Sequence, residues 1–129
     1  MAPGLGADAP HLPTPAPIDA YGNGGFRFAG MSHRGSILCL PDGIWAWAVA
    51  DIAALNEDVL APVFQRAQGL DLFLLGGGRN PFVLPARLRQ LFRAAEISVD
   101  CLATGPAAQT YNILLSEGRR VGAGLIAVA

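Results

Sequence analysis

The second half of the chain alternates between short apolar runs and longer stretches whose apolar residues repeat at helical spacing. Residues 70–75 ("LDLFLL") and 97–102 ("ISVDCL") are typical of strands covered on both faces, and residues 119–129 form a third such run. The stretches between them, 84–96 and 105–118, have the spacing of helices with one apolar face. This order of strand, helix, strand, helix and strand predicts a parallel sheet with right-handed crossovers.

Both predicted helices have recognisable ends. Pro85 opens the first helix, because the missing N–H of proline is not needed in a first turn. The second helix has Thr104 or Gly105 as its cap and Pro106 in its first turn, and it ends at Gly118.

Residues 18–51 have the pattern of short antiparallel strands. Asn23 and Gly24 favour a tight turn, and "PDG" at 41–43 predicts a hairpin between Ile37–Leu40 and Ile44–Val49. Together with the parallel half, this segment predicts an α/β fold, or α+β by a stricter definition. Antiparallel β-structure comes first and a βαβαβ half follows. A chain of 129 residues is long enough for one domain with one core.

Residues 56–69 ("NEDVLAPVFQRAQG") are harder to assign. Acidic residues stand near the start of this segment and Gly69 ends it, as in a helix. Pro62 cannot donate the hydrogen bond of an inner helical turn. The pattern therefore predicts a turn followed by a helix from about Ala61.

Residues 1–17 hold five of the ten prolines and almost no large apolar side chains. Such a segment cannot bury enough surface to offset the entropy of ordering it, so we expect a disordered, proline-rich tail, with the domain at residues 18–129. The start of the chain lacks the pattern of a signal or transit peptide, and no stretch is apolar for long enough to make a membrane helix. We expect a cytoplasmic protein with no membrane-spanning segment.

Composition narrows the chemistry further. Nine arginines, no lysine and ten acidic residues give a net charge of −1, which argues against nucleic acid as a partner. Cys39 and Cys101 stand far apart in apolar runs, which favours buried free thiols over a disulfide or a zinc site. No metal or cofactor is expected.

The glycine-rich stretch "LFLLGGGRN" (72–80) raises the question of a phosphate-binding loop. A dinucleotide fingerprint needs a third glycine where Pro81 stands, and a P-loop needs a lysine. Even so, these glycines follow a parallel strand and lie near the start of the next helix, where ligands collect in α/β sheets. The candidate ligand corner consists of Gly76, Gly77, Gly78, Arg79, Thr104 and Gly105. The alternative is a tight structural turn with a capping threonine.

Catalytic residues are not evident in the sequence. Ser32 and His33 are adjacent on a predicted strand, so their side chains point to opposite faces and cannot pair. Trp45 and Trp47 share one face of their strand, but small and apolar residues make the other face apolar too. These two tryptophans are either core residues or an interface, which could join a protein partner or a second copy of the chain.

The order of these segments resembles a family of small domains of unknown function. The resemblance rests on "IDAYGNGGFRFAGMSHRGSILCLPDG" (18–43), "LLGGGRN" with the helix after it, and "TYNILLSEGRRV" (110–121). The family includes the adipogenesis-associated Mth-type domain protein and a mitochondrial respiratory complex I assembly factor. The resemblance implies a compact α/β domain and supplies no catalytic residues.

The sequence and the family resemblance lead to two hypotheses for the function. The first, implied by the resemblance, is a non-enzymatic interaction or assembly factor whose partners are proteins, with intermediates of respiratory complex assembly as the candidates. The alternative is a protein that binds a small anion or nucleotide, and that could be an enzyme, at the corner formed by residues 76–79 and 104–105.

Overall fold

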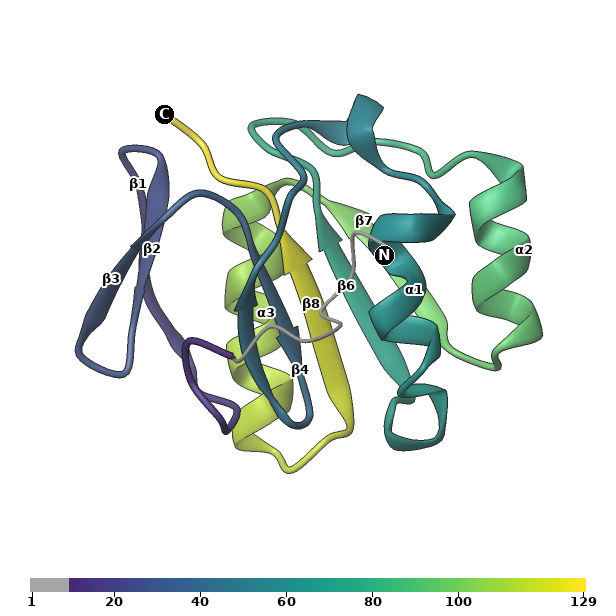
Figure 1. Cartoon of the computed structure of the whole chain (residues 1–129), viewed down its shortest axis with the longest axis horizontal. Coiled ribbons are helices and arrows are strands. Elements are labelled where there is room, and N and C mark those ends of the chain that lie inside the picture. The colour runs from purple at the N-terminus through teal and green to yellow at the C-terminus, as the bar shows by residue number, and fades with distance from the viewer. Residues whose placement is uncertain (1–9) are drawn as a thin grey trace.

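The computed structural model describes residues 10–129, which form two β-sheets and three α-helices (Figure 1). The small sheet has the order β1-β2-β3, and its strands are β1 (Ile18–Gly22), β2 (Gly25–Phe28) and β3 (Met31–Arg34). The larger sheet has the order β5-β4-β8-β6-β7, and its strands are β4 (Ile37–Leu40), β5 (Gly43–Ala46), β6 (Leu72–Gly76), β7 (Ser98–Leu102) and β8 (Val121–Leu125). The helices are α1 (Glu57–Phe64), α2 (Ala86–Ala94) and α3 (Thr104–Ser116), with single 3₁₀ turns at Ile52–Ala54 and Ala67–Gly69.

The parallel half is confirmed. β6 pairs in parallel with both β7 and β8, and α2 and α3 are the crossovers that return the chain to the sheet. The large sheet separates two apolar clusters. Side chains of α1 and α2 pack on one face, and side chains of α3 and of the small sheet pack on the other. The predicted α/β class is correct.

The antiparallel half is confirmed as well, and it is divided between the two sheets. β1, β2 and β3 pair in sequence, while β4 pairs antiparallel with β5 on one side and with β8 on the other. The Asn112 amide of α3 holds the small sheet in place: its Oδ1 accepts from the backbone N–H of Ile18 at 2.7 Å, and its Nδ2 donates to the backbone oxygen of Ile18 at 2.8 Å.

The predicted start of the first helix is wrong. α1 begins at Glu57, four residues before Ala61, and includes Pro62. The Asn56 side chain caps the helix by accepting from the Val59 N–H at 2.9 Å. Pro62 removes one hydrogen bond, to the carbonyl of Asp58, and that residue is exposed, so water can satisfy the carbonyl. A well-capped first turn therefore outweighs one proline in a helix this short.

The proline-rich segment differs from the expected disorder at residues 10–12. Leu12 forms an antiparallel bridge with Ile44, and the Ile44 N–H donates to the Leu12 carbonyl at 2.9 Å. These residues thus cover the outer edge of β5. Residues 1–9 of the predicted tail lie outside the described part of the chain.

β5 ends at Ala46, although the sequence predicts a strand up to Val49. One more hydrogen bond continues the pairing, from the Trp47 N–H to the Ser36 carbonyl at 2.9 Å, and the Val49 N–H then donates to the Trp47 carbonyl in its own segment.

Over residues 10–129 no helix combines the length and the apolar character that crossing a bilayer requires.

Candidate functional site

The predicted corner is assembled as the topology requires. β6 ends at Gly76, and the next two glycines pass beside the first residue of α3, Thr104. The Thr104 hydroxyl donates to the Ile126 carbonyl at 2.6 Å and accepts from the Gly78 N–H at 3.0 Å. The Thr104 N–H in turn donates to the Gly78 carbonyl at 2.8 Å. The corner therefore connects β6, α3 and the segment after β8.

Most of the N–H groups that would hold an anion at this corner are already engaged. The Gly77 N–H donates to the Leu102 carbonyl at 2.8 Å, and those of Gly78 and Thr104 form the bonds just described. Pro106 has no N–H to offer. An anion would have to displace internal hydrogen bonds, so the corner leaves few donors for a ligand.

Two of the glycines have structural reasons of their own. A Cβ at Gly76 would lie 2.9 Å from the Cα of Thr104, so only glycine lets β6 approach α3 this closely. Gly78 has a φ of 109°, which residues with a side chain rarely adopt. These observations account for the sequence of the turn without a bound phosphate.

Arg79 and Gly105 are the remaining residues of the predicted ligand corner, and each contacts another part of the chain. Arg79 is exposed, and its guanidinium donates to the Ala129 carbonyl at 3.3 Å. Gly105 packs against Tyr21, whose hydroxyl occupies the place that a Cβ would take. Arg79 thus contacts the C-terminal segment, and Gly105 contacts the small sheet.

The two tryptophans do not form a surface. Trp45 and Trp47 are 5% and 6% exposed and belong to the core between the large sheet and helices α1 and α2. The indole N–H of Trp47 donates to the Val59 carbonyl at 3.0 Å, and the Arg66 guanidinium lies 5.1 Å from the centre of the Trp45 ring. Of the two alternatives for these residues, the described chain has the core, because it covers both indoles itself.

His33 and Ser32 face in different directions, as expected from their adjacent positions on β3. The His33 ring lies 4.6 Å from the His11 ring. Burial lowers the pKa of His33, the neighbouring His11 lowers it further, and a backbone hydrogen bond at Ser36 partly opposes both. Ser32 is exposed opposite Arg27. Within residues 10–129, no three His, Cys, Asp or Glu side chains gather closely enough to hold a metal ion.

Both cysteines are free, as the sequence predicts. Cys39 is fully buried, and Cys101 is partly buried in β7. Burial raises the pKa of Cys39 to about 12, although a hydrogen bond with the Tyr111 hydroxyl lowers it slightly. Burial also raises the pKa of Cys101. Neither environment favours the reactive thiolate.

A thiol assay should reflect this protection. With Ellman's reagent at pH 8, a Cys101→Ser variant is expected to release no chromophore while folded and one equivalent in denaturant. The ordinary pKa of the thiol is 9.0, and the pKa in the folded protein is about 12. Burial of the neutral thiol therefore contributes its full share to the free energy of unfolding below pH 9, and this share is lost as the pH rises towards 12. Rapid release from the folded variant would contradict this account of Cys39.

The sequence did not predict a hollow at the small sheet, whose lining includes the buried Phe26 and the partly buried His33 as well as polar side chains. It has a volume of about 380 Å³ and includes Asn23, Arg27, Ser32 and Arg34. The alternation in "FRF" and in "SHR" could have indicated it, because it places Arg27 and Arg34 on the face opposite the buried phenylalanines.

The structure defines a class of protein: a single α/β domain in which a mixed five-stranded sheet lies between two helices on one face and a third helix with a small antiparallel sheet on the other. The chain belongs to the family described as "Protein of unknown function (DUF498/DUF598)", whose model matches residues 18–126. The predicted family is thereby confirmed.

Two relatives illustrate the family. An uncharacterised protein of Rhodobacter capsulatus is 40% identical over 110 residues, which cover 85% of this chain and 83% of that protein. The human NADH dehydrogenase [ubiquinone] 1 alpha subcomplex assembly factor 3 is 29% identical over 109 residues, which cover 84% of this chain and 59% of the human protein. This chain therefore matches little more than half of the human protein.

Solved structures share the fold. A Bartonella henselae protein, described as an outer membrane protein, has a TM-score of 0.89 at 44% identity, covering 92% of this chain and all of that one. A Bordetella pertussis protein, described as a Mth938-like domain, has a TM-score of 0.76 at 25% identity, covering 86% and 85% of the two chains.

Proposed function

We propose that this chain is an assembly factor that binds protein partners during the assembly of respiratory complex I. The observation that carries the proposal is the match to assembly factor 3, which extends over nearly the whole of the described domain. The matched region is the domain itself, which supports extending the role of that relative to this fold.

The arrangement of polar groups supports a binding role over the alternative. At the corner of residues 76–79 and 104–105, the donors of Gly77, Gly78 and Thr104 are bonded within the chain. No observation there favours an anion or nucleotide. The exposed side chains of Arg27 and Arg34, beside the hollow at the small sheet, offer groups that a protein partner can contact.

The proposal predicts a defect in assembly when the chain is missing. Cells that lack it are expected to contain less mature complex I and more partially assembled intermediates, because an assembly factor stabilises an intermediate and is absent from the product. Blue-native electrophoresis with in-gel NADH oxidation measures both species.

Two controls define this experiment. Re-expression of the wild-type chain should restore mature complex I, and succinate dehydrogenase should stay unchanged throughout. Normal amounts and a normal rate of appearance of complex I in the deletion strain would refute the respiratory assignment.

A further inference from the structure

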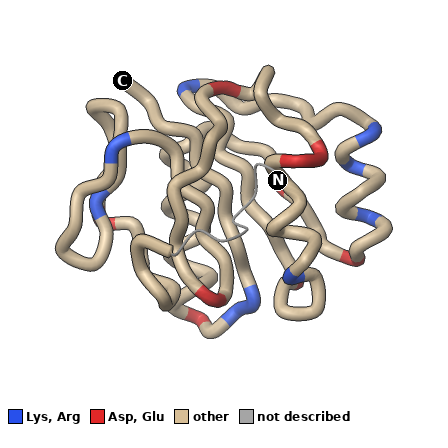
Figure 2. The backbone as a smooth tube through the Cα atoms, in the orientation of Figure 1, with Lys and Arg blue, Asp and Glu red and all other residues tan. Residues whose placement is uncertain are grey.

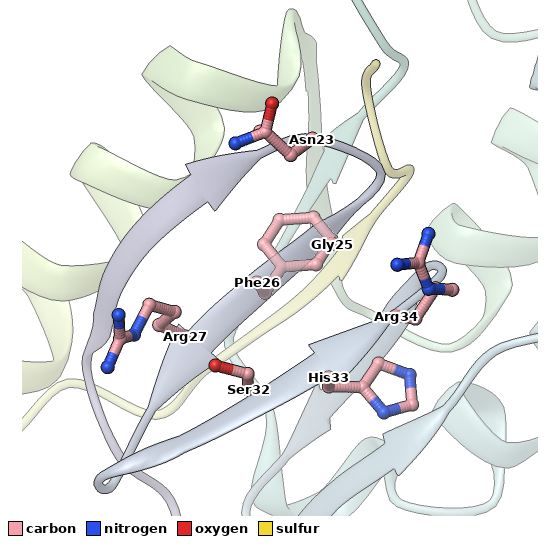
Figure 3. A pocket seen from close by; sticks show the side chains of 8 residues that line it. Asn23, Gly25, Phe26, Arg27, Ser32, His33 and Arg34 are labelled. Atoms are coloured by element: carbon pink, nitrogen blue, oxygen red, sulfur yellow. The ribbon is translucent and has the colours of Figure 1, made fainter.

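We propose that the outer face of the small sheet, formed by Asn23, Arg27, Ser32 and Arg34, is the docking site for an extended acidic segment of a protein partner. We call this surface the arginine face (Figure 3). The inference rests on the proposed function for the idea that the partner is a protein. The shape and charge of the face specify what that partner must present.

The strand register places the arginines on one surface. Arg27 of β2 is paired with Ser32 of β3, and Arg34 is paired with Gly25. The alternation along both strands sends these side chains outward, while Phe26 of β2 is buried on the inner side. Arg27 and Arg34 are thus diagonal neighbours on paired strands, a position at which the two Cα atoms typically lie about 7–8 Å apart.

The charge of this face is not neutralised within the described chain. Arg66, Arg87 and Arg120 each form an ion pair with an acidic side chain, whereas Arg27 and Arg34 form none over residues 10–129. The acidic residue of β1, Asp19, stands at the bulge of that strand and makes no ion pair with either arginine. The small sheet therefore carries an excess of positive charge (Figure 2), although the whole chain has a net charge of −1.

Backbone hydrogen bonds hold the turn beside Arg34 in a fixed shape. The Gly24 N–H donates to the Val128 carbonyl at 2.7 Å, and the Gly24 carbonyl accepts from the Gly35 N–H at 2.7 Å. No side chain fits at Gly25, because a Cβ there would overlap the carbonyl oxygen of His33. The turn beside Arg34 is thus anchored to Gly35, the residue after β3, and to the C-terminal segment.

The spacing of the charges selects the ligand. Figure 3 shows Arg27 and Arg34 at opposite ends of the hollow, with Ser32 between them. An extended chain with acids at alternate positions places carboxylates about 6–7 Å apart on one side, close to the roughly 7–8 Å that separates diagonal residues of two paired strands. Each guanidinium could then bind one carboxylate in the bidentate manner that arginine favours.

A peptide titration tests this site in the intact protein. The probe is a fluorescein-labelled Glu-Thr-Glu-Thr-Glu peptide, compared with Gln-Thr-Gln-Thr-Gln, and the readout is fluorescence anisotropy. We expect saturable binding of the acidic peptide alone, weakened by salt. Arg27→Gln and Arg34→Gln should each lower the affinity about tenfold, as the loss of one charge-assisted contact does.

The matched control is the double variant Arg89→Gln/Arg93→Gln. These two arginines lie on α2, are also exposed and form no ion pair in the described chain, so the variant changes net charge without touching the arginine face. It should bind the peptide within about twofold of the wild type, since long-range charge effects are screened. Equal weakening in the control, unchanged binding in Arg27→Gln and Arg34→Gln, or no binding by the wild type would overturn the proposal. Displacement of the peptide by inorganic phosphate at equal concentration would instead indicate a small-anion site and would also overturn it.

The same variants separate this inference from the proposed function. If the deletion strain shows the complex I defect and an Arg27→Gln/Arg34→Gln chain restores assembly fully at wild-type abundance, the docking site is wrong and the assembly role stands. If the deletion has no defect, the assembly role is wrong, and the peptide titration still decides whether the arginine face binds an acidic segment.

Discussion

Replacement of Trp47 by alanine is expected to lower the free energy of unfolding by about 4 kcal/mol, as truncating a buried aromatic side chain does. The indole is 6% exposed, and its ring lies against Gly124, where a Cβ would approach the ring to 2.6 Å. The substitution leaves a cavity between β8 and α1. It also removes the indole N–H that donates to the Val59 carbonyl. Urea denaturation followed by circular dichroism measures the change.

Trp47→Phe separates the two contributions. It keeps most of the apolar volume and loses the N–H, so we expect a smaller loss of about 1–3 kcal/mol, from one buried hydrogen bond together with a small void. Ala48, the exposed neighbour, supplies the control: Ala48→Ser should change stability by less than about 0.5 kcal/mol. If Trp47→Ala were as stable as the wild type but dissociated a dimer, the tryptophan would be an interface residue after all.

Thr104→Val should be the second strongly destabilising change. Thr104 is 0% exposed, and its hydroxyl both donates to the Ile126 carbonyl and accepts from the Gly78 N–H. Valine has nearly the same shape but can do neither, so the buried Ile126 carbonyl and the partly buried Gly78 N–H each lose this partner. We expect a loss of about 3 kcal/mol, at about 1–3 kcal/mol for each unsatisfied group.

The comparison with Thr104→Ser identifies the hydroxyl as the cause. Serine keeps both hydrogen bonds and removes one methyl group, which should cost about 1 kcal/mol. Hydrogen exchange should also become faster at the Gly78 amide in Thr104→Val and stay slow in Thr104→Ser. Equal stability of the two variants would show that the hydroxyl does not hold the corner together.

Much of the fold could be predicted because local patterns agree with their tertiary environment. The apolar runs at 70–75 and 97–102 became parallel strands, and the helix opened by Pro85 begins at Ala86. α1 begins earlier than the proline predicts because the Asn56 side chain caps its first turn and offsets the hydrogen bond that Pro62 cannot make. The bridge at Leu12 depends on the exposed edge of β5, which residues 10–12 alone do not reveal.

The candidate sites were harder to predict because burial and bonding are decided by distant residues. The sequence correctly predicts that the glycine turn and Thr104 lie together. The carbonyls that accept from the Gly77 N–H and the Thr104 hydroxyl, those of Leu102 and Ile126, come from other segments. The sequence left Trp45 and Trp47 as either core or interface residues, because strand periodicity does not place α1, whose side chains pack in the same core. The arginine face arises from a register between β2 and β3 that only the folded sheet displays.

The position of β8 has a consequence for synthesis on the ribosome. β8 lies between β4 and β6, so these two strands have no contact along the sheet until residues 121–125 have emerged from the exit tunnel. Until then the nascent chain exposes an apolar hairpin and an apolar βαβ unit, each with an unpaired strand edge. Contacts between segments this distant in sequence also form slowly. Nascent chains stalled before residue 121 should therefore bind chaperones, and chains stalled with the whole domain outside the tunnel should release them.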